Sequence, residues 1–262
     1  MNIIVCLKQV PDTAKVKMNP DGTLIRAGVA AILNPSDHFA LAKALEIKKQ
    51  TGAKIKVLSM GPEQALKVLR LALALGADEG YLLCAREFAG SDTWATAYAL
   101  ASAIKKISPF DLILCGQMAI DGDTAQTGPG IAGQLNIAQI TFCSDIKIAD
   151  NKTILATKLI DGGHQILEAD LPALITLSTP NNFVLPYPGF KSIFEAQQKP
   201  LFTWSAKDIE ADITKLGLNG SPTRVAKIYP PAPKQKGKVL TLPAEQTALE
   251  LVKILEAQKV SK

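Results

Sequence analysis

The chain has 262 residues, of which 47% are hydrophobic and 20% are charged, as in an ordinary globular protein. This composition excludes a disordered, a collagen-like or a small disulfide-stapled chain. The net charge of +5 comes from residues 224–262, which hold eight Lys or Arg and three Asp or Glu. No aromatic or arginine cluster accompanies these lysines, so we expect no nucleic-acid partner. No apolar run approaches the ~18 residues that span a bilayer, and the N-terminus lacks a basic leader, so we expect a cytoplasmic protein without membrane insertion.

Short apolar strands alternate with helices through the first half of the chain. The expected strands are residues 3–7, 55–60, 80–84 and 111–115. The expected helices are residues 36–50, with Ser36 as its cap, 63–75, 92–107 with Ser91 or Asp92 as its cap, and 127–135. Four such units with short connections are typical of an α/β fold with a doubly wound, mainly parallel, Rossmann-like nucleotide-binding sheet.

The pattern changes after the fourth unit. Residues 139–149, 152–160, 165–169 and 172–178 alternate between apolar and polar side chains and are separated by turn signals. We expect them to be antiparallel strands added at one side of the sheet.

The end of the chain is rich in proline and basic residues. Residues 230–233 can only be extended, and an amphipathic helix is expected at 244–258. We therefore expect an α/β domain at residues 1–190 and an extended C-terminal segment at 191–262. Its terminal helix docks on a partner subunit, or alternatively packs on its own domain.

The segment after the fourth strand, residues 116–129, carries the clearest chemical signal. It is rich in glycine and small polar residues and leads directly into a helix, so the backbone N–H groups of residues 124–128 favour a phosphate. Carboxylates at Asp121 and Asp123 suit the hydroxyls of a ribose or ribityl chain. The side chains that can donate to phosphate oxygens are Thr124, Gln126 and Thr127. The structural alternative is a glycine-rich turn capped by Asp and Thr.

No catalytic or metal-binding constellation accompanies this loop. The cysteines form no C-x-x-C pair, and the two histidines, His38 and His164, have no matching nucleophile and orienting group. We expect the four cysteines to be buried, reduced thiols. A nucleotide site without an acid, base or nucleophile indicates that a bound cofactor carries the chemistry.

Several segments occur in an order that resembles one family. They are residues 5–13 (VCLKQVPDT), Asn34-Pro35, 59–62 (SMGP), 72–78 (ALALGAD), 88–93 (FAGSDT), 119–126 (AIDGDTAQ) and 218–223 (LNGSPT). Together they resemble the β subunit of electron-transfer flavoprotein over almost the whole chain.

The resemblance implies an electron-transfer subunit in a heterodimer with an α subunit that carries an FAD. Residues 122–129 look like the electron-bifurcating type, which holds a second FAD in this subunit; AMP, as in the simple carriers, is the alternative. In the bifurcating type, NADH donates electrons that pass to a flavoprotein dehydrogenase, of the acyl-CoA or hydroxy-acid kind, and to ferredoxin or flavodoxin. A rival of another class is an ATP- or AMP-binding regulatory module.

The resemblance also implies which residues contact the cofactor, to which Lys8 is added as a group that could stabilise an anionic reduced flavin. These residues are Cys6, Lys8, Asn34, Pro35, Ser36, Asp37, Met60, Gly116, Gln117, Met118, Ala119, Ile120, Asp121, Gly122, Asp123, Thr124, Ala125, Gln126 and Thr127. One departure stands out: Pro186 occupies the position where the family usually has an arginine that recognises the dehydrogenase. Loss of that bidentate donor implies an unusual dehydrogenase partner.

Overall fold

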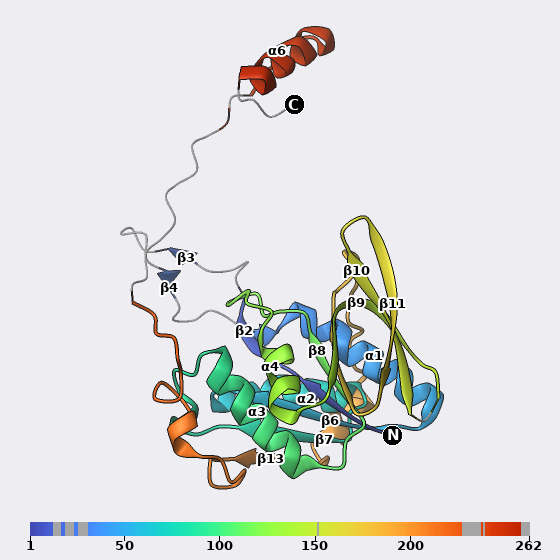
Figure 1. The fold of residues 1–262 in the computed structure, drawn as a ribbon, viewed down its shortest axis with the longest axis vertical. Coiled ribbons are helices and arrows are strands. Elements are labelled where there is room, and N and C mark those ends of the chain that lie inside the picture. Colours follow the sequence, from blue (N-terminus) through green and yellow to red (C-terminus); the bar gives the residue numbers. More distant parts are fainter. Residues whose placement is uncertain are drawn as a thin grey trace. The chain divides into compact units, whose positions relative to one another are not determined.

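A computed structural model shows one sheet of nine strands in the order β11-β10-β9-β12-β8-β1-β6-β7-β13, with helices on both faces (Figure 1). The structure describes residues 1–12, 17–18, 24–25, 31–150, 152–226, 237 and 239–257. The chain divides into two compact units, Met1–Ala226 and Lys227–Lys262. The α/β fold expected from the sequence is confirmed.

The elements expected in the first half are all present. The four central strands are β1 (Asn2–Cys6), β6 (Lys54–Met60), β7 (Glu79–Leu83) and β8 (Leu112–Gly116). The helices that follow them are α1 (Pro35–Thr51), α2 (Leu66–Leu75) after a short 3₁₀ turn (Glu63–Ala65), α3 (Thr93–Ile107) after a second 3₁₀ turn (Arg86–Phe88), and α4 (Thr127–Leu135). Asp92 caps α3 by accepting hydrogen bonds from the N–H groups of Trp94 and Ala95.

One helix start differs from the expectation. Helix α1 begins at Pro35 with Asn34 as its N-cap residue, so Ser36 lies inside the first turn and does not cap it. Proline suits the first helical position because its missing N–H is not needed there. The Asn34 side chain makes no cap hydrogen bond, which leaves it free for the loop contacts described below.

The strands after α4 are β9 (Ala138–Ile148), β10 (Thr153–Ile160), β11 (Gly163–Asp170) and β12 (Ala173–Leu177). β9, β10 and β11 form an antiparallel extension, as expected. The expectation that residues 172–178 are antiparallel is wrong, because β12 pairs in parallel with both β8 and β9. α1 and α4 both contact β12, and every residue of the strand is buried, as in a parallel strand covered on both faces.

Smaller elements complete the first unit. β13 (Leu201–Trp204), which follows α5 (Phe190–Ala196), adds a parallel strand beside β7 at the other edge of the sheet. β2 (Gln9–Pro11) pairs with β5 (Ala31–Leu33), β3 (Lys17–Met18) pairs with β4 (Leu24–Ile25), and a 3₁₀ turn spans Ile213–Lys215.

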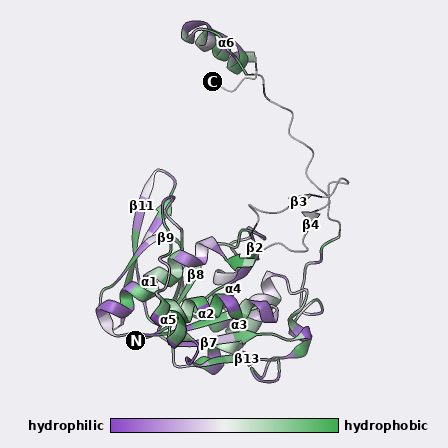
Figure 2. Ribbon diagram, turned by 180° about the vertical axis from the view of Figure 1, so that it is seen from behind, coloured by the Kyte–Doolittle hydropathy of each residue, from purple (hydrophilic) through white to green (hydrophobic). Residues whose placement is uncertain are grey.

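The core has two halves, one on each face of the sheet. Ile3 and Val5 of β1 pack in the cluster that contains buried residues of α1 and α2, whereas Ile4 packs in the cluster formed with α3 and α4. This alternation follows from the period of two along a strand. Figure 2 shows hydrophobic residues gathered in the strands and in the helices that cover them.

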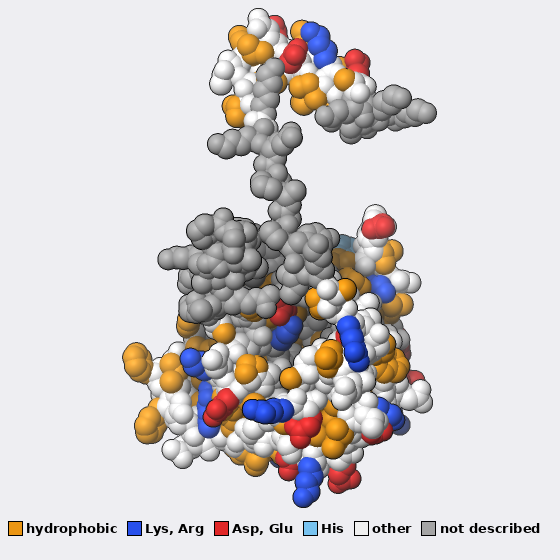
Figure 3. Space-filling model, turned by 90° about the vertical axis from the view of Figure 1, so that its left-hand side faces the viewer, with side chains coloured by type: hydrophobic (Ala, Val, Ile, Leu, Met, Phe, Trp, Pro, Cys, Tyr) orange, Lys and Arg blue, Asp and Glu red, His pale blue; other side chains and the backbone are white. Residues whose placement is uncertain are grey.

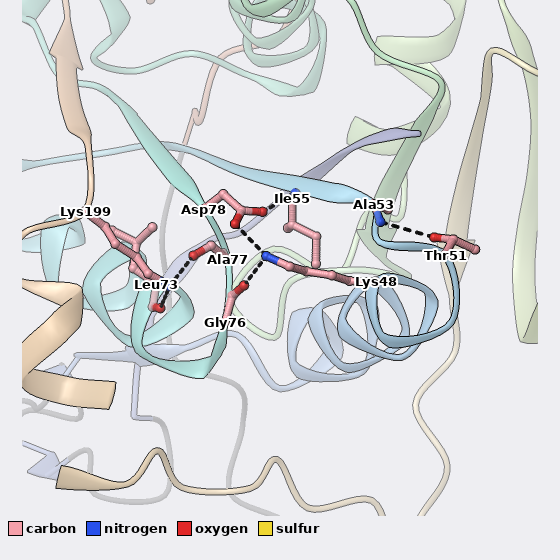
Figure 4. A network of polar contacts seen from close by, with 9 residues as sticks. All are labelled: Lys48, Thr51, Ala53, Ile55, Leu73, Gly76, Ala77, Asp78 and Lys199. Carbon is pink, nitrogen blue, oxygen red and sulfur yellow. Dashed lines mark hydrogen bonds and ion pairs between the residues drawn. The ribbon is translucent and has the colours of Figure 1, made fainter. Parts of the chain in front are cut away.

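A polar network ties the helices to the amino ends of the strands (Figure 4). Lys48 of α1 donates to Asp78 Oδ1 over 2.5 Å and to the Gly76 carbonyl over 2.9 Å, and Asp78 Oδ2 accepts from the N–H of Ile55 at 2.8 Å. Lys199 donates to the carbonyl of Leu73 in α2 and to that of Ala77, just after this helix. The network lies at the amino ends of the strands, whereas the candidate site lies at their carboxyl ends.

The second unit contains α6 (Ala244–Ala257), in close agreement with the expected helix at 244–258. Its apolar side chains include Leu249 and Val252, which are 64% and 50% exposed. Residues 230–233 lie outside the described residues. Docking of the terminal helix on a partner subunit stays a prediction.

Among the described residues, none of the helices is both long and apolar enough to cross a membrane. On the face of the first unit drawn in Figure 3, acidic and basic side chains are interspersed.

Candidate functional site

A cavity of about 360 Å³ lies at the carboxyl ends of the central strands. The chain winds from β1 to β6 and β7 on one side, whereas β8 and β12 lie on the other, so the winding changes direction between β1 and β8. In open α/β sheets, ligands bind outside the carboxyl ends of the strands at such a switch point. Cys6 of β1, Met60 of β6 and Cys115 of β8 all line the cavity.

Asn34 fastens the loop after β8 to the start of α1. Its side chain is 1% exposed; Nδ2 donates to the Met118 carbonyl over 2.9 Å, and Oδ1 accepts from the N–H of Ile120 at 3.2 Å. Its backbone N–H donates to the Lys8 carbonyl over 2.9 Å. One buried amide therefore joins the loops that follow β1 and β8 at the cavity.

Asp37 is a buried carboxyl group in the wall of the cavity. Burial raises its pKa to about 7, and hydrogen bonds from the backbone N–H of Lys8, from Asn34 and from the N–H of Gly116 only partly oppose that shift. The Lys8 N–H lies 2.7 Å from Asp37 Oδ2. Desolvation penalises the charged form of a carboxyl group, and here it outweighs the donors that favour that form.

Gly116 is required by the close approach of β8 to α1. A Cβ atom at this position would lie 2.5 Å from the carbonyl carbon of Ser36 and 2.7 Å from the backbone nitrogen of Asp37. Both neighbours are backbone atoms, which cannot move aside at low cost. Glycine at the end of β8 therefore lets the strand and the first turn of α1 form one wall.

Lys8 and Asp121 form an ion pair between the two loops. Lys8 Nζ lies 2.7 Å from Asp121 Oδ1 and 2.9 Å from Oδ2. Both side chains are partly exposed, 47% and 31%, so the pair contributes at most about 1 kcal/mol to stability. Asp121 thus compensates the charge of Lys8. The sequence analysis expected each of these two side chains to contact the cofactor and did not foresee that they pair with each other.

The start of α4 offers unused hydrogen-bond donors beside the cavity. None of the backbone N–H groups of residues 124–128 donates to another described residue, and Gln126, the N-cap residue, makes no side-chain cap hydrogen bond. Asp123 and Ala125 have positive φ values of 48° and 53°, and left-handed residues of this kind occur in the backbone nests that bind anions. Such a concave run of amides at a helix start attracts anions.

A further part of the cavity wall comes from the start of α3. The Thr93 hydroxyl donates to Gln126 Oε1 over 2.9 Å and so joins α3 to the loop before α4. Asp92 also accepts from the N–H and hydroxyl of Thr223, at 2.9 and 2.8 Å. The end of the first unit is therefore held beside the cavity wall.

Most of the residues expected to contact the cofactor do gather around this cavity. Those that line it are Cys6, Lys8, Asn34, Asp37, Met60, Gly116, Gln117, Met118, Ala119, Gly122, Asp123, Thr124, Ala125, Gln126 and Thr127. Those that do not line it are Pro35, Ser36, Ile120 and Asp121. Contact with a cofactor stays a prediction for the residues of both groups.

Sequence reasoning missed part of the lining. The additional residues are Leu7, Leu58, Ser91, Asp92, Thr93, Thr96, Leu100 and Cys115. The polar run at 91–93 follows β7, whose carboxyl end lies at the same edge of the sheet as those of β1, β6 and β8. The rule that located the other loops applies equally to this one, so the signal was present in the sequence.

The described residues fit a phosphorylated nucleotide better than a metal ion. They contain no group of three or more His, Cys, Asp or Glu side chains that could hold a metal. The cavity instead combines free amide donors with apolar side chains such as Leu58 and Met60. A few polar groups in a largely apolar pocket are typical of cofactor sites.

Comparison with known proteins identifies the family. The family model described as "Electron transfer flavoprotein domain" matches residues 21–209. The chain is 46% identical to an electron transfer flavoprotein subunit beta of Thermoanaerobacterium thermosaccharolyticum, over 99% of this chain and 100% of that protein. It is 45% identical to caffeyl-CoA reductase-Etf complex subunit CarD of Acetobacterium woodii and 42% identical to acryloyl-CoA reductase electron transfer subunit gamma of Anaerotignum propionicum, in each case over 92% of both chains. The chain therefore belongs to the electron transfer flavoprotein family and is similar to its β subunits.

Proposed function

We propose that the first unit binds FAD in the cavity between β1 and β8. We further propose that, with an α subunit, it passes electrons from NADH to a flavoprotein dehydrogenase and to ferredoxin or flavodoxin. The observation that carries this proposal is the run of free amides at residues 124–128, which opens onto the cavity at the switch point of the sheet. An anionic diphosphate satisfies these donors, and the positive end of the α4 dipole favours it.

The neighbouring side chains have separate roles in this proposal. Thr124 and Thr127 donate to phosphate oxygens, and Asp123 accepts from hydroxyl groups. Asn34 and Asp37 hold the loops around the cavity, because both bridge the segments that follow β1 and β8. When bound, the flavin supplies hydride acceptance and single-electron release, which no side chain lining the cavity provides.

The names of two relatives support a reductase or dehydrogenase partner. Both names refer to the reductase of a CoA ester, caffeyl-CoA in one and acryloyl-CoA in the other. We propose that this chain also serves a flavoprotein of the acyl-CoA or hydroxy-acid kind. Pro186 in place of the usual arginine supports a partner that is recognised without a bidentate cation at that position.

AMP is the second candidate for the cavity, and the volume of the cavity favours it. At about 360 Å³ the cavity lies near the lower limit of ligand sites, which run from about 300 to about 1,000 Å³. A nucleoside monophosphate fills such a space, whereas the flavin half of FAD would extend beyond it. In that case the chain is the AMP-containing subunit of a simple electron carrier.

Counting cofactors distinguishes the candidates. The chain is co-expressed with its α subunit, the purified complex is denatured, and the released flavin and AMP are measured per heterodimer. We expect two FAD and no AMP; one FAD with one AMP would overturn the assignment of FAD to this subunit. A colourless complex would favour a regulatory nucleotide-binding module instead.

Reduction by NADH tests bifurcation separately. Anaerobic stopped-flow mixing of NADH with the complex should bleach flavin absorbance without any dehydrogenase present. Lys8→Met should slow this bleaching, because it removes a cation that lines the cavity and leaves the negative charge of Asp121 unpaired beside it, which disfavours an anionic reduced flavin. Lys54→Met, at the amino end of β6, should not. If NADH does not reduce the wild-type complex, the electron donor is another molecule.

A further inference from the structure

Two cysteines on neighbouring strands line the cavity. Cys6 ends β1 and Cys115 belongs to β8, and the two are direct partners in the parallel pairing of these strands. Directly paired residues of neighbouring parallel strands lie about 4.8 Å apart and point to the same face. Both side chains line the cavity; Cys6 is half-buried and Cys115 is 7% exposed.

The two thiols interact with each other. A hydrogen bond with Cys6 is the largest cause of the raised pKa of Cys115, followed by burial. Cys115 therefore carries its proton at neutral pH. The other two cysteines, Cys84 and Cys143, do not line the cavity.

A pair of neutral thiols without a third ligand suits a particular chemistry. The described residues offer no cluster of three ligands, so a divalent metal that needs four donors does not fit. The two cysteines are free thiols rather than a disulfide, whose sulfurs lie about 2.05 Å apart. An atom that bridges the two sulfurs spans a wider gap. Trivalent arsenic with one organic substituent needs only two thiolates and has the softness that sulfur ligands select.

We propose that Cys6 and Cys115 form a two-thiol site for monosubstituted trivalent arsenic compounds inside this cavity. An arsenoxide, R–As=O, loses its oxygen and forms two As–S bonds, one to each cysteine. The two thiol protons leave with that oxygen as water. Arsenic stays trivalent, so no oxidant or reductant is required.

Occupation of this site competes with the nucleotide. Both ligands use the same cavity, so the organic group on an arsenic atom bound to the two cysteines fills space that the cofactor needs. This consequence, unlike the thiol site itself, rests on the proposed function. It predicts that AMP or FAD slows the reaction with the arsenical.

The test uses phenylarsine oxide with the full-length chain in its complex with the α subunit, after removal of the cofactor. The mass of this chain is measured after exposure to an excess of glutathione, which removes arsenic held by a single thiol. We expect one phenylarsenic group that resists glutathione and is released by dimercaptopropanol. Peptide mapping of the wild-type chain should find the bridge between Cys6 and Cys115, an observation that does not depend on the folding of any variant.

Variants assign the site independently. Cys6→Ala and Cys115→Ala should each lose the glutathione-resistant adduct, whereas Cys84→Ala and Cys143→Ala should keep it. An adduct that survives in either of the first two variants, or a mapped bridge to another cysteine, overturns the inference. If the adduct forms as expected but neither AMP nor FAD slows it, the thiol site stands and the nucleotide is misplaced.

Discussion

The buried carboxyl group of Asp37 should make the stability of this protein depend on pH in a specific direction. Its pKa rises from 3.8 to about 7 on folding, so the folded chain binds a proton that the unfolded chain has already released. Stability from this group is therefore highest below pH 3.8 and falls until the pH passes about 7. Each pH unit in this window costs about 1.4 kcal/mol, so the cost between pH 5.5 and 7 is about 2 kcal/mol.

The perturbation is Asp37→Asn, which removes the titration with little change of volume. The free energy of unfolding is measured by urea denaturation of wild type and variant from pH 5.5 to 8.5. We expect wild type to lose about 2 kcal/mol relative to the variant between pH 5.5 and 8.5, most of it below pH 7, with the curve levelling off about one unit above the folded pKa. Subtracting the two curves removes the contribution of every other group.

A control and a clear refutation accompany this experiment. Asp161→Asn, at an exposed turn between β10 and β11, changes the net charge by the same amount outside the cavity. Its difference from wild type should show no comparable loss between pH 5.5 and 7. If the difference between Asp37→Asn and wild type is also constant with pH, burial does not raise the pKa of Asp37 and the reasoning is wrong.

Three further predictions test the site and the second unit. Thr124→Val should weaken cofactor binding by about 1–3 kcal/mol in a titration of the cofactor-free complex, because a charged phosphate loses a donor. Thr203→Val, at an exposed position of β13, should leave the affinity unchanged. If Thr124→Val binds the cofactor as tightly as wild type, Thr124 is not part of the site. Gly116→Ala should destabilise the chain by about 1–3 kcal/mol in urea denaturation because its Cβ meets backbone, whereas Gly122→Ala, with open space around it, should be nearly neutral. Truncation after Ala226, at the end of the first unit, should leave that unit folded by circular dichroism but weaken assembly with the α subunit in pull-down. Undiminished co-purification would contradict docking of the tail.

The local pattern of the sequence determined which segments became strands and helices. Continuous apolar residues at 3–7 indicate a strand buried on both faces, and Ile3, Ile4 and Val5 are each fully buried in β1. Asp92 caps α3 because its carboxylate reaches the first free N–H groups of its own helix, a contact between neighbours in the chain. The loop at 116–129 can be recognised for the same reason, since its glycines, small polar residues and following helix are adjacent in the sequence.

The tertiary structure alone decided what lies across from each segment. Asn34 was recognised as a site residue, but its bonds to Met118 and Ile120 join positions more than 80 residues apart. The direction of β12 was misjudged because alternation indicates a strand without saying which neighbours it pairs with. The pairing of Cys6 with Cys115 likewise arises only when β1 and β8 become neighbours in the sheet. Local patterns report the propensity and burial of a segment, whereas such contacts depend on the order and register of strands that the whole chain must bring together.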